Sequence, residues 1–163
     1  MITPLFLFSF LSIQNLNRQA TQKSFMVYAV KNTSATAFIQ GMQVYLQADT
    51  IEPALFRTVL QPHWQQNGLE AVSPQPASVP KTLLPDGNTL IVWNGLRILF
   101  LEHPPKIWPQ EKTELDFIVL QKNVKIKPEE LLQHYQVRKV IFDSSNKPWY
   151  RRKMGEVFAN LNQ

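Results

Sequence analysis

Alternation of apolar and polar residues marks the first part of the chain as β-structure. Phe25–Val30 alternates in this way, as half-buried strands do. Ala37–Gln40 and Gln43–Gln47 then flank Gly41, a residue that adopts positive φ without steric cost. The pattern predicts one strand followed by a hairpin that turns at Gly41.

A helical spacing of apolar residues follows this β unit. Glu52–Trp64 carries Leu55, Val59 and Leu60 on one side of a helix with about 3.6 residues per turn. Thr50 stands before the segment as a candidate N-cap, because its hydroxyl can accept a bond from a free helical N–H. We therefore predict a short amphipathic helix here.

The middle of the chain is predicted to form an irregular connector followed by a second hairpin. Residues 71–87 hold four of the twelve prolines, which predicts an irregular connector between two halves. Thr89–Trp93 and Leu96–Leu101 are apolar runs joined by Asn94-Gly95. Asn-Gly is the strongest short-range sequence signal for a type I′ hairpin turn.

The second half is predicted to contain a strand, a helix, a strand and a final helix. Leu115–Leu120 is an apolar run typical of a strand covered on both faces. Pro128 suits the first position of a helix through Glu129–Tyr135, and Lys139–Phe142 forms the next strand. Lys147–Asn160 has the spacing of an amphipathic helix.

The final helix has a predicted apolar face of Trp149, Met154, Val157 and Phe158. Strands with interleaved helices thus occur on both sides of the connector. This arrangement predicts an α/β layered fold with mixed sheets, in which helices cover the faces of the sheets.

Composition fits one globular domain. The chain has 163 residues, of which 44% are hydrophobic and 18% charged, so it can bury a core and is not a disordered tail. It has no cysteine, which excludes disulfides, zinc–thiolate sites and thiol nucleophiles. The formal net charge of +5 suits a polyanionic partner such as nucleic acid or an anionic membrane, and equally a solvated basic surface.

The amino-terminal residues form a separate apolar run, Ile2–Ile13. It is shorter than the roughly 20 apolar residues that a spanning helix needs, and it lacks the basic start of a signal peptide. A poor signal peptide, a membrane-surface anchor and the end of a transmembrane helix all fit, and we favour the last. The predicted organisation is an apolar segment at 1–19 and a domain at 20–163, whose halves are 20–70 and 88–163.

Three segments together resemble the carboxy-terminal domain of ComEC-type competence proteins: residues 25–49, 89–102 and 115–149. The most specific match is FDSSNKPW at 142–149, which resembles the F-D-x-S-N-x-x-W stretch of one branch of that family. The resemblance implies a metallo-β-lactamase-like domain of the inner-membrane protein that passes single-stranded DNA during natural transformation. It also implies that the apolar run ends a membrane helix and that the chain is a truncated piece of a longer protein.

The metal-binding motifs of active family members are missing. They carry H-x-H-x-D-H after the first hairpin, whereas the interval after Asp49 offers one histidine, His63. Residues 121–125 read QKNVK where active members have G-H-H-G-S, and residues 29–34 read AVKNTS where they have D-V-G-Q-G-D. Two metal ions need several imidazole and carboxylate ligands at one site. We therefore expect a degenerate, non-catalytic domain without metal or cofactor.

The other histidines offer little support for a metal site. His103 lies where a predicted hairpin ends, and His134 lies in a predicted helix of mixed polarity. A metal site would need both to converge with His63. Asp143 with Ser144 could mimic a nucleophile site, but such a strand end more often forms turns and caps. The alternatives left open are a divergent metal-dependent hydrolase or nuclease, and an interaction module without a DNA role.

Basic residues on two neighbouring loops are the best candidates for DNA contact. Lysines and arginines can follow phosphates while aromatic faces stack on unpaired bases. The carboxyl ends of parallel strands share one edge of a sheet, so both loops are predicted to form one positive rim there. The predicted contacts, from a cluster that also holds Tyr150 and Lys153, are Lys122, Lys125, Lys127, Lys147, Trp149, Arg151 and Arg152. Trp149 and Tyr150 fit equally well as core anchors of the last helix.

Partners and location follow from the resemblance. It implies single-stranded DNA, the membrane channel portion of the family and the other DNA-uptake components as partners. The family's usual topology places the domain on the outer, periplasmic face of the inner membrane. Arg18, Lys23 and Lys31 after the apolar run favour the cytoplasm instead by the positive-inside rule. We follow the family's topology.

Overall fold

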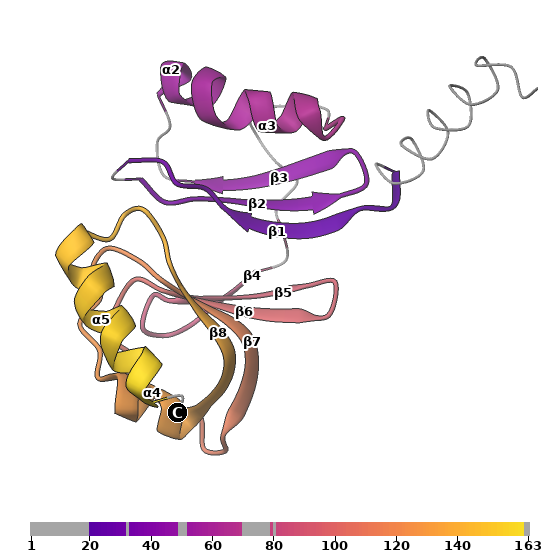
Figure 1. Cartoon of the computed structure of the whole chain (residues 1–163). Helices are drawn as coiled ribbons and strands as arrows, with labels where there is room; N and C mark the ends of the chain where they lie inside the picture. The colour runs from indigo at the N-terminus through magenta and orange to yellow at the C-terminus, as the bar shows by residue number, and fades with distance from the viewer. Residues whose placement is uncertain (1–19, 32, 49–51, 70–78, 80, 162–163) are drawn as a thin grey trace, which may run out of the picture.

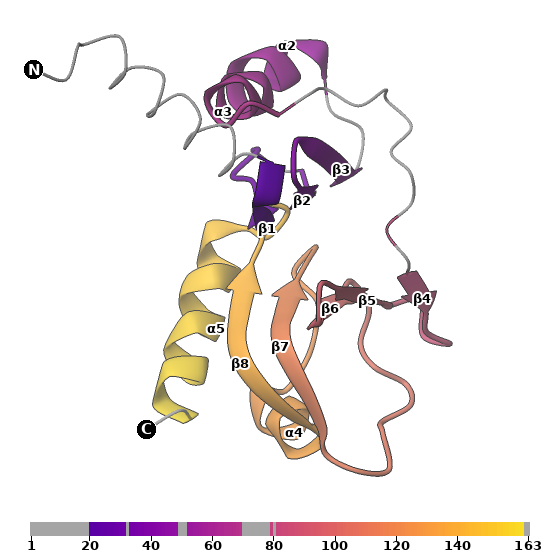
Figure 2. The same cartoon turned by 90° about the vertical axis from the view of Figure 1, so that its right-hand side faces the viewer.

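Two β-sheets lie face to face with helices on their outer sides, as the computed structural model shows from two directions (Figure 1, Figure 2). The predicted α/β layered fold with mixed sheets is thereby confirmed. The structure describes residues 20–31, 33–48, 52–69, 79 and 81–161. Predictions for residues 1–19, for Thr50 and for most of the connector lie outside this part of the chain.

The first sheet is antiparallel and has three strands, β1 (Lys23–Val27), β2 (Ala35–Gln40) and β3 (Gln43–Ala48). The hairpin between β2 and β3 is confirmed, and Gly41 in its turn has a φ of +61°. The predicted first strand was placed too late, because β1 begins at Lys23 and its ladder with β2 ends at Val27. The residues after it enter a turn, where the N–H of Thr33 bonds to the carbonyl of Val30.

One helical stretch covers the outer face of this sheet (Figure 1). It consists of α2 (Pro53–Leu55), the π-helical turn η1 (Phe56–Leu60) and α3 (Gln61–Gln66), so the predicted helix is confirmed but the widened turn was missed. Pro62 explains the irregularity, since it has no N–H for a helical bond and its ring crowds the preceding turn.

The second sheet has five strands in the order β4-β5-β6-β7-β8. β4 (Lys81–Leu83), β5 (Thr89–Trp93) and β6 (Leu96–Leu101) pair antiparallel. β7 (Thr113–Leu120) and β8 (Tyr135–Phe142) continue the sheet in parallel. Residues 81–83 were predicted to be irregular connector, and the structure corrects this: they pair with β5 across a turn at 84–88.

The strand–helix–strand prediction for the second half is also confirmed. α4 (Pro128–His134) connects the parallel strands β7 and β8, and it begins at Pro128 as predicted. Tyr135, predicted to end the helix, is the first residue of β8. α5 (Pro148–Leu161) then packs along the outer face of the five-stranded sheet (Figure 2).

The buried face of α5 agrees with the predicted one at Met154 and Phe158 but not at Trp149. Tyr150, Met154 and Phe158 are buried, whereas Trp149 is 55% exposed. Residues four apart lie above one another on a helix, so these three share one line and Trp149 lies about 100° away from it. Tyr150 therefore takes the core position that the sequence pattern assigned to Trp149.

Three apolar clusters join the layers. One lies between the first sheet and its helices around Leu60 and Trp64, and another lies between the second sheet and α5. Between the sheets, Phe38 of β2 packs with Ile98 and Phe100 of β6. Among the described residues, no helix is long and apolar enough to cross a membrane.

Candidate nucleic-acid interface

The candidate site lies where the parallel strands of the second sheet end. β6, β7 and β8 all point to the edge nearest the first sheet, and the loops that follow β7 and β8 meet there (Figure 2). In open α/β sheets, ligands usually bind outside the carboxyl ends of the strands.

A buried carboxylate, Asp143, occupies the base of this edge with only 1% of its surface exposed. Its Oδ2 accepts a bond from Gln121 Nε2 over 2.9 Å, and its Oδ1 accepts from the backbone N–H of Ser145 over 3.1 Å. Asn146 Nδ2 donates to the same Oδ1 over 3.0 Å. The carboxylate is thus satisfied by neutral donors, which is the turn-and-cap role expected for a strand-end Asp-Ser-Ser-Asn.

Gln121 also reaches across to the first sheet. Its side-chain amide donates to Ser34 Oγ, at the start of β2, as well as to Asp143 at the end of β8. Ser34 and Gln121 are both at most 7% exposed. A hydrogen-bonded chain of small polar groups therefore joins the two sheets at the edge where the loops converge.

The two candidate loops lie side by side, joined by three hydrogen bonds between backbone N–H groups and side chains. Lys122 N donates to Ser145 Oγ over 2.8 Å, and Asn123 N donates to Asn146 Oδ1 over 2.9 Å. Lys147 N donates to Asn123 Oδ1 over 2.7 Å. Lys122 and Asn123 have φ of +51° and +55°, so this loop holds a left-handed turn that presents its N–H groups to the other loop.

A groove of about 730 Å³ opens beside these loops. It runs between the loop after β6, the loop after β7 and the first turns of α5. The apolar side chains that line it are Pro104, Pro105, Trp108, Val124, Ile126, Trp149, Tyr150 and Met154. The charged ones are Lys122, Lys125, Lys127, Glu130 and Lys153. The groove therefore combines an apolar, aromatic lining with a surplus of positive charge.

The aromatic residues of the groove differ in exposure. Tyr150 is buried, and its hydroxyl donates to the carbonyl of Val124 over 2.6 Å, which ties α5 to the loop after β7. Burial raises the pKa of Tyr150 to about 12. Trp149 lies edge-on to Tyr150, with ring centroids 5.9 Å apart, and remains more than half exposed. Trp108 stacks on His134 at 4.6 Å between centroids.

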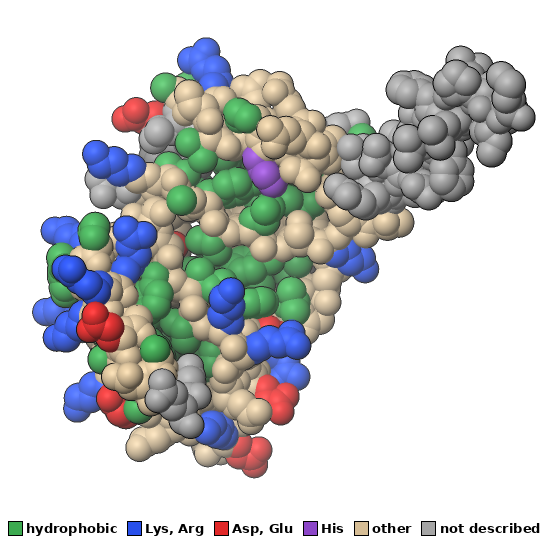
Figure 3. Space-filling model, in the orientation of Figure 1, with side chains coloured by type: hydrophobic (Ala, Val, Ile, Leu, Met, Phe, Trp, Pro, Cys, Tyr) green, Lys and Arg blue, Asp and Glu red, His purple; other side chains and the backbone are tan. Residues whose placement is uncertain are grey.

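The predicted DNA contacts divide into two groups. Lys122, Lys125, Lys127 and Trp149 line the groove, and Lys122 also forms an ion pair with Glu102. The others, Lys147, Arg151 and Arg152, are exposed on and before α5 and do not line it. Figure 3 shows Lys and Arg side chains along the left-hand side of the molecule, where α5 lies.

The groove also holds Lys153, which belonged to the predicted basic cluster but not to the final predicted contacts, and Trp108, which was not predicted. Lys153 stands four residues after Trp149 on the same helix and so lies on the same side. Trp108 lies in the loop after β6, far from the basic segments in sequence. Only the packing of that loop against α4 and α5 brings it to the groove.

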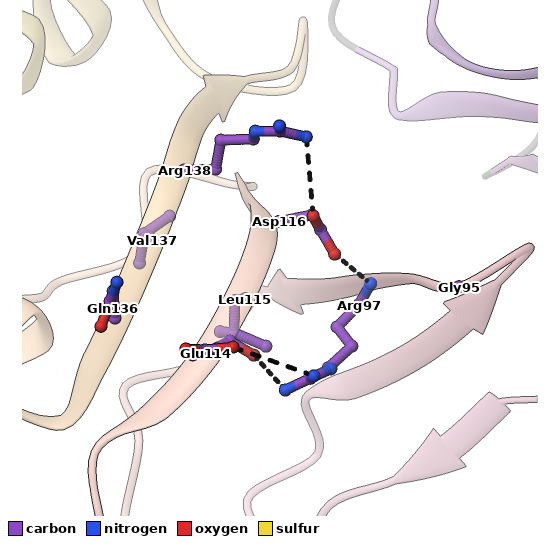
Figure 4. A pocket seen from close by; sticks show the side chains of 8 residues that line it. All are labelled: Gly95, Arg97, Glu114, Leu115, Asp116, Gln136, Val137 and Arg138. Carbon is purple, nitrogen blue, oxygen red and sulfur yellow. Dashed lines mark hydrogen bonds and ion pairs between the residues drawn. The ribbon is translucent and has the colours of Figure 1, made fainter.

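A second, charged pocket of about 520 Å³ lies at the opposite end of the parallel strands (Figure 4). The backbone N–H of Arg97 donates to Asp116 Oδ2 over 2.8 Å, and Arg138 pairs with the same carboxylate at 3.9 Å. Arg97 also donates to the carbonyl of Glu114 over 3.1 Å. Asp116 thus satisfies the N–H of Arg97, one residue before the β6–β7 ladder begins at Ile98, so this network has a clear structural role.

The described residues contain no group of three or more histidine, cysteine, aspartate or glutamate side chains placed to hold a metal. The histidines have separate neighbours. His63 Nδ1 lies 3.0 Å from Tyr28 Oη, and His134 stacks on Trp108.

A family model described as the ComEC C-terminal domain matches residues 25–163. No curated protein and no solved structure matches the chain.

Proposed function

The chain belongs to the ComEC C-terminal domain family, and on that premise we propose that it guides single-stranded DNA beside a transport channel without catalysing a reaction. Family membership implies a role in competence DNA uptake. We propose, beyond family membership, that the domain guides DNA, contacts it directly and catalyses no reaction.

One observation carries the proposal: two lysine-bearing segments meet at a groove with aromatic walls. Lys125 and Lys127 come from the loop after β7, and Lys153 and Trp149 come from α5. Single-strand-binding proteins combine positive charge that follows the phosphates with aromatic faces on which bases stack. The groove offers both on neighbouring elements.

The polar groups at the carboxyl ends of the parallel strands support a non-catalytic role. Asp143 is enclosed and bonded to Gln121, Ser145 and Asn146, so it is poorly placed to reach a substrate or a metal ion. Lys122 stands on the loop where active relatives carry metal ligands, and its charge would repel a cation. We therefore favour guidance of DNA over hydrolysis.

We also propose a location and partners for the domain. It lies on the outer, periplasmic face of the inner membrane, next to the channel portion of the family and the other DNA-uptake components. If the domain lies on the periplasmic face, protease added to intact spheroplasts should cleave a tagged form of it. If the domain is cut only after the membrane is lysed, it lies on the cytoplasmic side.

Salt-dependent binding of oligonucleotides tests the central proposal. If about four cations neutralise phosphates, the slope of log affinity against log salt should be roughly −3, at about −0.7 per contact. Replacing the groove lysines Lys122, Lys125, Lys127 and Lys153 with alanine should flatten that slope without unfolding the domain. A parent that binds no oligonucleotide in a salt-dependent manner, or a fourfold variant that binds equally well at every salt concentration, rules out the DNA role.

A charge-matched control is available on the same chain. Lys23, Lys81, Lys112 and Lys139 are exposed and do not line the groove. Alanine at these four positions removes the same net charge, so it separates local contacts from the long-range attraction of the whole molecule. We expect this variant to keep most of the slope.

A further inference from the structure

We propose that the groove beside α5 is a base-binding site, in which an unpaired base stacks on Trp149 while Lys125, Lys127 and Lys153 hold the adjoining phosphates. This inference rests on the proposed function and makes it more specific. It assigns the two chemical parts of a nucleotide to two different sets of side chains.

The exposure of Trp149 is the first reason. The core line of α5 is already filled by Tyr150, Met154 and Phe158, so packing does not need an indole at this position. Trp149 nevertheless stands at the groove with 55% of its surface exposed. More than half of the residue is therefore accessible to a stacking partner.

The size and lining of the groove are the second reason. About 730 Å³ falls within the roughly 300–1,000 Å³ of sites that take small organic ligands. Trp108 and Ile126 contribute apolar surface to the same lining as Trp149. A flat, largely apolar body with negative charge at its margin fits this combination, and a nucleotide has that shape and charge.

The distribution of charge is the third reason. Lys122 is paired with Glu102, so part of its charge is already compensated. Lys125, Lys127 and Lys153 form no ion pair with the part of the protein that the structure describes, and all three are exposed at the groove. They therefore remain available for phosphate, whereas Lys122 is the weaker candidate.

The site should distinguish single from double strands. In a duplex the bases are stacked on one another and their faces are inaccessible to a side chain, so only the lysines could make contact. In a single strand a base can turn out of the backbone and cover the indole. Loss of one such stack costs roughly 1–3 kcal/mol, or about 5- to 150-fold in affinity.

Binding of a fluorescent oligothymidylate, a duplex and an abasic oligonucleotide of the same length tests the inference. Trp149→Ala should weaken binding of the oligothymidylate roughly 5- to 150-fold, leave the salt slope unchanged, and leave binding of the abasic strand as it was. Trp149→Phe should keep most of the affinity, because it keeps an aromatic face. Thermal unfolding of each variant checks that the fold is intact.

Tryptophan emission gives a second, independent measurement. Trp64 and Trp93 are buried, so quenching on addition of oligothymidylate should come mainly from the groove and should fall sharply in Trp149→Phe. If the parent binds DNA in a salt-dependent manner but Trp149→Ala binds as tightly, the stacking inference is wrong and the proposed function stands. If the parent binds anionic vesicles and no oligonucleotide, the groove faces lipid and both are wrong.

Discussion

Gln121 Nε2 donates to Asp143 Oδ2 over 2.9 Å, and the same amide donates to Ser34 on the other sheet. One neutral side chain thus satisfies a buried carboxylate and joins two layers of the fold. It does so at the carboxyl ends of the parallel strands, the edge at which related architectures place ligands. The polar groups of this edge are hydrogen-bonded to one another within the fold. The open groove lies beside them.

Gln121→Ala should lower stability, because Asp143 Oδ2 and Ser34 Oγ are buried and would lose the hydrogen bonds that the Gln121 amide donates to them. An unsatisfied buried polar group costs about 1–3 kcal/mol, so the Tm should fall by several degrees for a chain of this size. Gln133→Ala is the control, since Gln133 is exposed on α4. Equal melting of the two variants would mean that the bridge between the sheets contributes nothing.

Gly95→Val should destabilise the second sheet. Gly95 has a φ of +85° in the β5–β6 turn, and no atom lies within 4 Å of an added Cβ, so the penalty arises from the backbone alone. A β-branched residue at positive φ costs about 1–3 kcal/mol.

A glycine on α5 provides the contrast to this turn. Gly155 lies in the helix and also has open space around an added Cβ. Gly155→Ala should therefore stabilise the protein, by up to about 1 kcal/mol. Urea denaturation of both variants measures the difference. A Gly95→Val protein as stable as the parent would contradict the turn geometry.

Stability should decline at alkaline pH through Tyr150. Its pKa is raised to about 12 by burial, against about 10 for an ordinary tyrosine, so the unfolded chain loses this proton first. The contribution of Tyr150 to the free energy of unfolding is complete below about pH 10 and is lost as pH rises through about 12. Tyr150→Phe should reduce the decline in this range. Tyr28 and Tyr135 also have pKa values raised by burial, so part of the decline should remain.

A chelator should leave the melting temperature unchanged. The chain has no cysteine, and the described residues hold no cluster of three metal-binding side chains. A structural metal contributes its binding free energy to folding, so its removal would lower the Tm clearly. Melting with and without EDTA, together with elemental analysis for zinc and manganese, makes the measurement. A drop of several degrees, or stoichiometric metal, would favour the divergent hydrolase instead.

Local chemistry in the sequence was enough to predict most of the elements. Asn94-Gly95 specified its hairpin because few residue pairs adopt two successive positive φ angles. Pro128 marked the start of α4, and the apolar run of β7 indicated a strand covered on both faces. The predictions were wrong where the secondary structure depends on a neighbour in space. Residues 81–83, for example, form a strand because they pair with β5.

For the candidate site, the sequence was sufficient to show which basic residues follow the two parallel strands, and therefore that Lys122, Lys125 and Lys147 share one edge. It could not determine which aromatic ring of α5 is exposed, because Trp149 and Tyr150 are adjacent and both suit a core. The rotation of α5 against the sheet places Tyr150 in the core and leaves Trp149 exposed. The tertiary structure also brought Trp108 to the groove, since contacts between distant segments depend on packing and leave no periodic signal in the chain.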